Sequence, residues 1–158
     1  MKKLISIRIM AFAGIVSLPM AVSPRMGQSI PSADYRNDPR LERLRTFFAK
    51  LDCPAWKDAA SFLEAADDYA LDWRLLPSLS YVESTGGKAA RHNNLFGWNS
   101  GRAQFSSPHA AIHIIGFTLG HAERYRDKDL NALLLTYNPN VEYPAKVKSV
   151  MRRIAPAE

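Results

Sequence analysis

The feature that most constrains this chain is the helical spacing of apolar residues in a series of separate segments. In one of them a single face of a 3.6-residue helix carries Leu75, Leu76, Leu79 and Val82. Similar patterns predict further helices over 39–51, 54–69, 108–125, 130–136 and 144–154. The sequence therefore predicts an all-α fold, and its 158 residues are enough for one domain with a substantial core.

The N-terminus has the pattern of an export signal. Lys2, Lys3 and Arg8 precede a short apolar run at 9–22 that contains Gly14 and Pro19. We expect residues 1–27 to be a signal peptide or a retained N-terminal anchor with a linker, followed by an N-terminal helical segment at 28–53 and the main domain at 54–158. With such an N-terminus, we expect the protein to be exported to the periplasm or cell envelope.

The charge of the chain narrows the class of molecule that it can bind. The formal net charge is +6, and residues 1–27 hold four of the bases and no acids. From Arg74 to the end there are 11 bases and 6 acids, a bias that suits an anionic polymer. No nucleic-acid motif accompanies this basic bias, and export argues against nucleic acid as the partner.

Cys53 is the only cysteine, which excludes an internal disulfide, and we expect it to be a small buried residue.

Glu83 lies in the last turn of the helix that begins near Leu75, three positions before Gly86-Gly87. Glycine readily takes the left-handed conformation of a C-terminal cap, so we expect the helix to stop there. The negative end of the helix dipole and partial burial both disfavour a carboxylate anion. The pattern thus favours a protonated carboxyl group, which a general acid requires.

The stretch Lys88–Gln104 shows no helical period and is rich in Asn, Gly and Ser. We expect an irregular loop, with room for one short hairpin, beside the Glu83 helix. Within it Trp98 offers either a flat face to a sugar ring or a packing surface. Asn94 either binds an N-acetyl group or holds the loop, and Phe96 is expected in the core.

Two motifs resemble a known family. The first motif resembles the peptidoglycan-cleaving members of the lysozyme-like superfamily. It consists of Glu83-Ser84 at a helix end, followed by a glycine and then by Asn94-Leu95-Phe96-Gly97. The bacterial β-N-acetylglucosaminidase (autolysin-type) domains resemble it most, followed by the lytic transglycosylases. Tyr137-Asn138-Pro139 is the second motif, because these families place a tyrosine at such a helix end, facing the acid.

The resemblance covers residues 54–154 and implies a lysozyme-like helical domain that cleaves β-1,4 bonds in the glycan strands of peptidoglycan. It implies Glu83 as acid and base, and a set of substrate-binding residues: Ser84, Asn94, Trp98, Tyr137 and Asn138. We expect a monomer. The alternative is a catalytically inactive peptidoglycan-binding module with the same fold.

The sequence departs from the family pattern in one respect that bears on the mechanism. No Asp or Glu occurs between Ser84 and Ala122. Two-carboxylate glycosidases need their pair within about 5–9.5 Å. A second carboxylate must therefore come from Glu123, Asp127, Asp129, Glu142 or the N-terminal helices. A 2-acetamido sugar allows a route with one acid, because its own acetamido oxygen can attack the anomeric carbon. We expect this route, with capture by the 6-hydroxyl and a 1,6-anhydro end favoured over hydrolysis.

His109 and His113 are spaced i, i+4, which can place two zinc ligands on one helix face. Ala110 stands where a zinc-protease motif has its glutamate, and no third ligand is evident from the sequence. We therefore expect a polar helix face, and neither a metal nor a cofactor.

Overall fold

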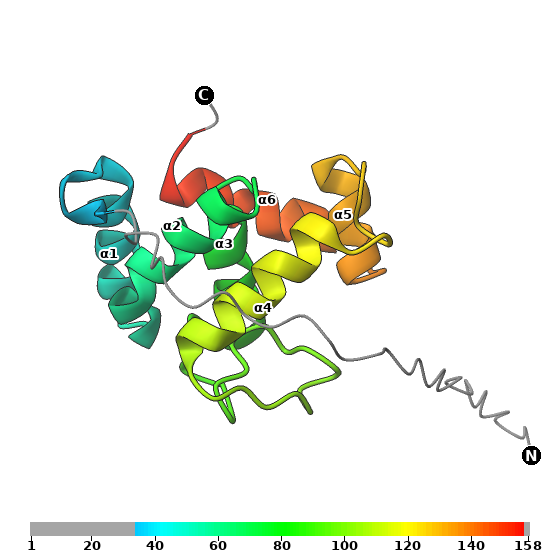
Figure 1. Ribbon diagram of the computed structural model, residues 1–158, viewed down its shortest axis with the longest axis horizontal. Coiled ribbons are helices and arrows are strands. Elements are labelled where there is room, and N and C mark those ends of the chain that lie inside the picture. Colours follow the sequence, from blue (N-terminus) through cyan, green and yellow to red (C-terminus); the bar gives the residue numbers. More distant parts are fainter. Residues whose placement is uncertain (1–33, 157–158) are drawn as a thin grey trace, which may run out of the picture. The chain divides into compact units, whose positions relative to one another are not determined.

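The computed structural model describes residues 34–156, and that part of the chain is all-helical, with no strand in it (Figure 1). This confirms the predicted all-α fold. Two short 3₁₀ helices lie at Tyr35–Asn37 and Pro54–Asp58. The α-helices are α1 (Pro39–Lys50), α2 (Ala59–Asp68), α3 (Leu75–Ser84), α4 (Pro108–His121), α5 (Leu130–Tyr137) and α6 (Tyr143–Ile154).

Side chains that cap the first turn begin three of the helices. Asp38 accepts a hydrogen bond from the Arg40 amide at 2.8 Å, directly before α1. Ser107 does the same for Ala110 at 3.0 Å before α4. Asp129 similarly caps α5. Each cap satisfies an amide that has no partner within its own helix, so local sequence determines where these helices start.

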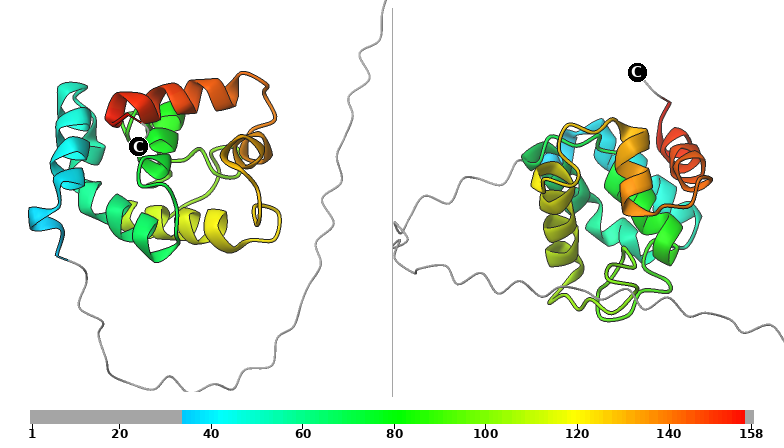
Figure 2. Two further views of the ribbon diagram at one scale, coloured as in Figure 1. Left: turned by 90° about the horizontal axis from the view of Figure 1, so that it is seen from above. Right: turned by 90° about the vertical axis from the view of Figure 1, so that its right-hand side faces the viewer.

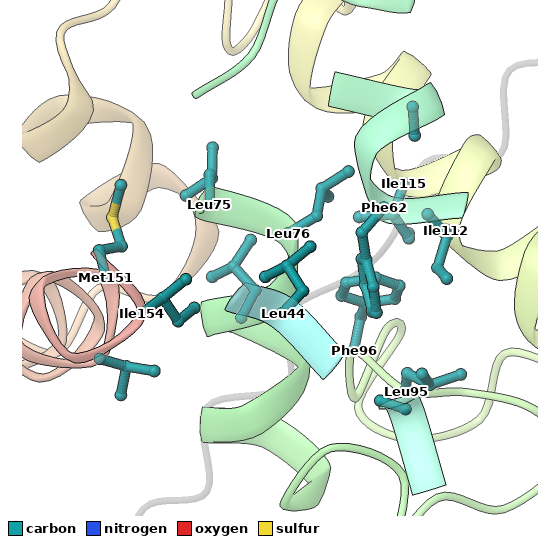
Figure 3. Packing of buried hydrophobic residues seen from close by; sticks show 14 of the residues in the cluster. Leu44, Phe62, Leu75, Leu76, Leu95, Phe96, Ile112, Ile115, Met151 and Ile154 are labelled. Carbon is teal, nitrogen blue, oxygen red and sulfur yellow. The ribbon is translucent and has the colours of Figure 1, made fainter. Parts of the chain in front are cut away.

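Helix α3 lies inside the helical body, and every residue from Leu75 to Ser80 is buried. It packs against α6 and α2, while α2 also packs against α4. Helices α4 and α6 lie on opposite sides of the body (Figure 2). All six helices contribute to one hydrophobic core, in which Leu76 of α3 lies among Leu44, Phe62 and Phe96 (Figure 3). The burial of α3 places its C-terminal carboxyl, Glu83, at the edge of this core.

The core shows no division at residue 53. Leu44 and Phe48 of α1 are fully buried in the same cluster as residues of α2 to α6. Within 34–156 the predicted N-terminal segment and main domain therefore form one unit, because α1 supplies part of their shared core. The predicted signal peptide or anchor at 1–27 lies outside the described residues. Within the described range, every helix is too short or too polar to cross a membrane.

Several predicted boundaries differ from the structure. The helix predicted at 54–69 is a 3₁₀ turn followed by α2. Helix α4 ends at His121 rather than at 125, because Ala122 takes an extended backbone with φ −66° and ψ 135°. The region 88–104 contains turns and bends and no hairpin strands. Consecutive left-handed residues there, such as His92-Asn93 and Asn99-Ser100, are incompatible with a regular strand.

Candidate active site

The end of α3 is set by a left-handed residue, but that residue is Thr85 and not a glycine. Thr85 has φ 55°, and its amide donates to the Tyr81 carbonyl at 2.9 Å. The Gly86 amide donates to the Ser80 carbonyl at 3.1 Å, which completes the C-terminal cap. Gly86 is needed for a different reason: a Cβ there would lie 2.8 Å from Cβ of Cys53. The glycine allows the turn after Glu83 to pack closely on the core.

The half-buried Glu83 carboxyl accepts one hydrogen bond from a distant residue and lies close to the backbone of the loop. The Tyr143 hydroxyl donates to Oε1 at 2.5 Å. Oε2 lies against the backbone of Gly97, where an added Cβ would be only 2.9 Å away. The glycine of the Asn-Leu-Phe-Gly stretch therefore makes room for the carboxyl group.

Two cavities meet at Glu83. One, of about 650 Å³, is bounded by the loop and the end of α5, and its lining includes Glu83, Trp98, Arg124, Tyr137 and Asn138. The other, of about 510 Å³, is bounded by the start of α6, and its lining includes Glu83, Asn138, Glu142, Tyr143 and Lys146. Glu83 and Asn138 line both. A separate hollow of about 730 Å³ between α1 and α6 does not include Glu83. The carboxyl group is thus accessible from two adjoining polar cavities, which we call the cleft.

Two stacked tyrosines form one side of the cleft. The rings of Tyr137 and Tyr143 lie 5.9 Å apart and nearly parallel. Burial raises the pKa of both phenols, and the negative charge of Glu83 raises each pKa further. Both therefore remain hydrogen-bond donors at neutral pH. Tyr137 donates to the Phe96 carbonyl at 2.6 Å, so it braces the loop.

Tyr137 was the tyrosine predicted to face the acid, whereas the hydrogen bond to Glu83 comes from Tyr143. The sequence prediction missed Tyr143 because it began the last helix at Pro144. The apolar spacing of α6 offers a signal, since Tyr143 lies on the same face as Val147 and Val150. That pattern indicates burial, but only the packing of α6 against α3 brings the hydroxyl to Glu83.

Ser84 does not line the cleft, which corrects its predicted role in substrate binding. Its side chain is buried, and Oγ is within hydrogen-bond distance of the Leu95 carbonyl at 2.8 Å and the Ser80 carbonyl at 3.0 Å. Oγ also accepts a hydrogen bond from the Gly87 amide at 3.0 Å. These contacts join the helix end to the loop, so Ser84 positions its neighbours.

Asn94 also lies behind the cleft. Its side-chain amide donates to the Trp98 carbonyl at 3.0 Å and accepts from the Trp98 amide at 2.9 Å. Of the two roles considered for Asn94, the structure supports holding the loop. Trp98 itself lines the cleft, with its ring 5.7 Å from that of Tyr137 and the Arg124 guanidinium 5.3 Å from its centre.

Among the candidate second carboxylates, Glu142 shares a cavity with Glu83. Glu123, Asp127 and Asp129 line neither part of the cleft. Glu142 is exposed, and Lys146 lines the same cavity.

Away from the cleft, the structure supplies a third metal-ligating side chain beside the two histidines of α4. Glu64 of α2 lies with His109 and His113 so that their ligand atoms are all within 4.8 Å of one another. Glu64 lies 45 positions before His109 in the sequence, so spacing along the chain does not indicate this third ligand.

No protein-family model, no curated protein and no solved structure matches this chain. The chain itself defines an all-α domain with a half-buried carboxyl group where two polar cavities meet.

Proposed function

We propose that this protein is an exported glycosidase that cleaves β-1,4 bonds between N-acetylmuramic acid and N-acetylglucosamine in peptidoglycan, with Glu83 as the acid and base. The observation that carries the proposal is the position of Glu83 between two adjoining cavities. An enzyme that cuts within a glycan strand must hold sugars on both sides of its acid. The cleft offers space on each side of a single carboxyl group.

The first step is protonation of the glycosidic oxygen by Glu83. As the carboxyl group loses its proton, the hydrogen bond from Tyr143 stabilises the resulting carboxylate. Because the pKa of Tyr143 is raised, the phenol keeps its own proton throughout. A hydrogen bond to a charged group contributes about 1.5–3 kcal/mol.

The second carboxylate of a conventional glycosidase is replaced in this proposal by the substrate. The acetamido oxygen attacks the anomeric carbon while the bond to the leaving sugar breaks, and the leaving oxygen takes the proton of Glu83. The 6-hydroxyl oxygen or a water oxygen then attacks the anomeric carbon and displaces the acetamido oxygen, while the Glu83 carboxylate accepts the proton of the attacking group. Attack by the 6-hydroxyl gives a 1,6-anhydro end, and attack by water gives a reducing end. The long stretch without acids favours the first product, while Glu142 is the base available for the second.

Glu83→Gln tests the acid directly, because glutamine keeps the size but has no acidic proton. We expect loss of clearing of a suspension of sacculi, with sacculus binding and melting temperature nearly unchanged. Glu123→Gln is the matched control, since it makes the same change at an exposed glutamate that lines neither part of the cleft. Clearing by Glu83→Gln at the wild-type rate would exclude Glu83. Binding without clearing by the wild-type protein would favour the inactive binding module.

Mass spectrometry of the digested sacculi identifies the reaction. An anhydro end is one water lighter than a reducing end, and we expect anhydro-muramyl ends. Reducing N-acetylglucosamine ends would indicate a glucosaminidase, and reducing N-acetylmuramic acid ends would indicate a muramidase. If Glu142 activates the water, Glu142→Gln should decrease the reducing ends alone.

A further inference from the structure

A second group of chemically active side chains lies on the face formed by α2 and α4, and it takes no part in the proposed reaction. His109 and His113 stand one turn apart on α4, and Glu64 faces them from α2. Nε2 of each histidine lies 3.6 Å from the same Glu64 oxygen, Oε2. None of the three residues lines either part of the cleft.

These distances are too long for hydrogen bonds but suit ligands of one metal ion. Zinc binds imidazole nitrogen at about 2.0–2.1 Å and carboxylate oxygen at about 2.0–2.2 Å, usually as a tetrahedron. Two ligand atoms at those distances are separated by about 3.3–3.5 Å. The two nitrogen–oxygen separations of 3.6 Å need only a small adjustment to reach that geometry. The two imidazole rings are already stacked, with centres 4.4 Å apart.

The environment of His113 leaves Nε2 available for a ligand. Its Nδ1 lies 3.2 Å from the Tyr69 hydroxyl and 4.0 Å from Oδ2 of Asp68. Nε2 is buried and has no hydrogen-bond partner among residues 34–156. A buried polar atom without a partner costs free energy, which a metal–nitrogen bond would offset. A second ring nitrogen held by an outer group is also the usual arrangement of a metal-bound histidine.

The charges around the two histidines favour a cation. Glu64 lies between them, and Asp68 lies close to His113. His109 remains exposed, so a water molecule can reach a fourth coordination position. Imidazole and carboxylate ligands together suit Zn²⁺ better than Mg²⁺ or Ca²⁺, which prefer oxygen ligands alone.

We propose that Glu64, His109 and His113 bind one Zn²⁺ ion that joins α2 to α4. The two helices belong to one core but are separated in the chain by α3 and the long loop. A metal ion between them therefore stabilises the folded state in a chain whose single cysteine excludes an internal disulfide. The site is independent of the proposed glycosidase activity.

The test uses the untagged full-length chain, freed of metal by a chelator and titrated with Zn²⁺ alone. We expect one ion per chain by calorimetry and metal analysis, and a rise in melting temperature of about 5–10 °C at a hundredfold excess of zinc over the dissociation constant. His109→Ala and Glu64→Gln should weaken binding at least about 10-fold. His92→Asn is the matched control, because it removes an exposed histidine that lies in the loop, outside α2 and α4, and is not one of the three ligands. Glu83→Gln should bind zinc normally whether or not it has lost activity.

His109→Ala is the decisive variant, because the His109 side chain is exposed and its loss should leave the fold intact. Circular dichroism can verify that the variant is folded. Absence of saturable zinc binding by the wild-type chain would overturn the proposal. Equal loss of affinity in His109→Ala and His92→Asn would also overturn it. Tyr69→Phe should weaken binding by about 10-fold if the phenol orients His113.

Discussion

Gly97→Ala is the sharpest test of how the candidate acid is positioned. Gly97 has φ +59°, and its added Cβ would lie 2.9 Å from Oε2 of Glu83. The Cβ needs at least 3.4 Å for ordinary van der Waals contact. The carboxyl group is the end of a flexible side chain, so it should move away by about 0.5 Å rather than disrupt the fold. That movement pulls Oε1 from the hydroxyl of Tyr143.

The expected costs of Gly97→Ala are different for stability and for activity. An alanine in the left-handed region costs about 1–2 kcal/mol. A displacement of about 1 Å can cost about 100-fold in rate, so we expect about a 10-fold loss of activity from half that distance. Gly101→Ala provides the control, because Gly101 also has a positive φ, +79°, while its Cβ would meet no atom within 4 Å. Gly101→Ala therefore has the free-energy cost of a left-handed alanine without a new contact with Glu83.

Both variants are compared by urea denaturation and by the rate at which they clear sacculi. We expect similar losses of stability and a slower rate for Gly97→Ala alone. Equal clearing rates would refute the inference that the position of this carboxyl group limits activity. A far larger loss of stability in Gly97→Ala would show that the carboxyl group cannot move aside.

Three further predictions concern the support of the site and of the fold. Tyr143→Phe should slow clearing about 10- to 100-fold, because it removes a hydrogen bond of about 1.5–3 kcal/mol to the candidate acid; an unchanged rate would contradict this. Gly86→Ala should lower the free energy of unfolding by about 3 kcal/mol, measured in urea, because it combines left-handed strain with a 2.8 Å contact to Cβ of Cys53. Arg40→Ala should cost about 0.5–1 kcal/mol at neutral pH, because Arg40 makes two 2.9 Å bonds to the half-exposed Asp67. The hydrogen bond from Arg40 holds the pKa of Asp67 below its usual value. The stabilisation is therefore present above about pH 4 and is lost as the pH falls through the folded-state pKa of Asp67. The melting temperatures of the wild-type protein and of Arg40→Ala should accordingly converge in acid.

The helices were predictable from sequence to the extent that their signals are local. Apolar spacing and the capping residues Asp38, Ser107 and Asp129 identify helix starts to within about a residue. The C-terminal ends were harder, as at Ala122, because a chain can leave a helix without a distinctive residue. Similarly, the 3₁₀ turn at Pro54–Asp58 contains apolar residues, Ala55 and Trp56, and leads directly into α2, so spacing alone does not separate the two.

The candidate site was only partly predictable. Glu83, Trp98, Tyr137 and Asn138 line the cleft, whereas Ser84 and Asn94 lie behind it. Small polar residues near a helix end can face either a ligand or the backbone, and sequence does not distinguish the two. Their hydrogen bonds to nearby carbonyl and amide groups depend on how the loop folds over α3.

The sequence by itself determined that the described part of the chain, 34–156, is all-helical and that a carboxyl group lies in the last turn of α3, because both follow from interactions within a few residues. Only the tertiary structure decided which side chains reach that carboxyl group. Tyr143 meets Glu83 across 60 positions, and Glu64 meets His109 across 45. Such contacts depend on the packing of one helix against another, α6 on α3 and α4 on α2, and helical periodicity specifies which face is buried without specifying its partner.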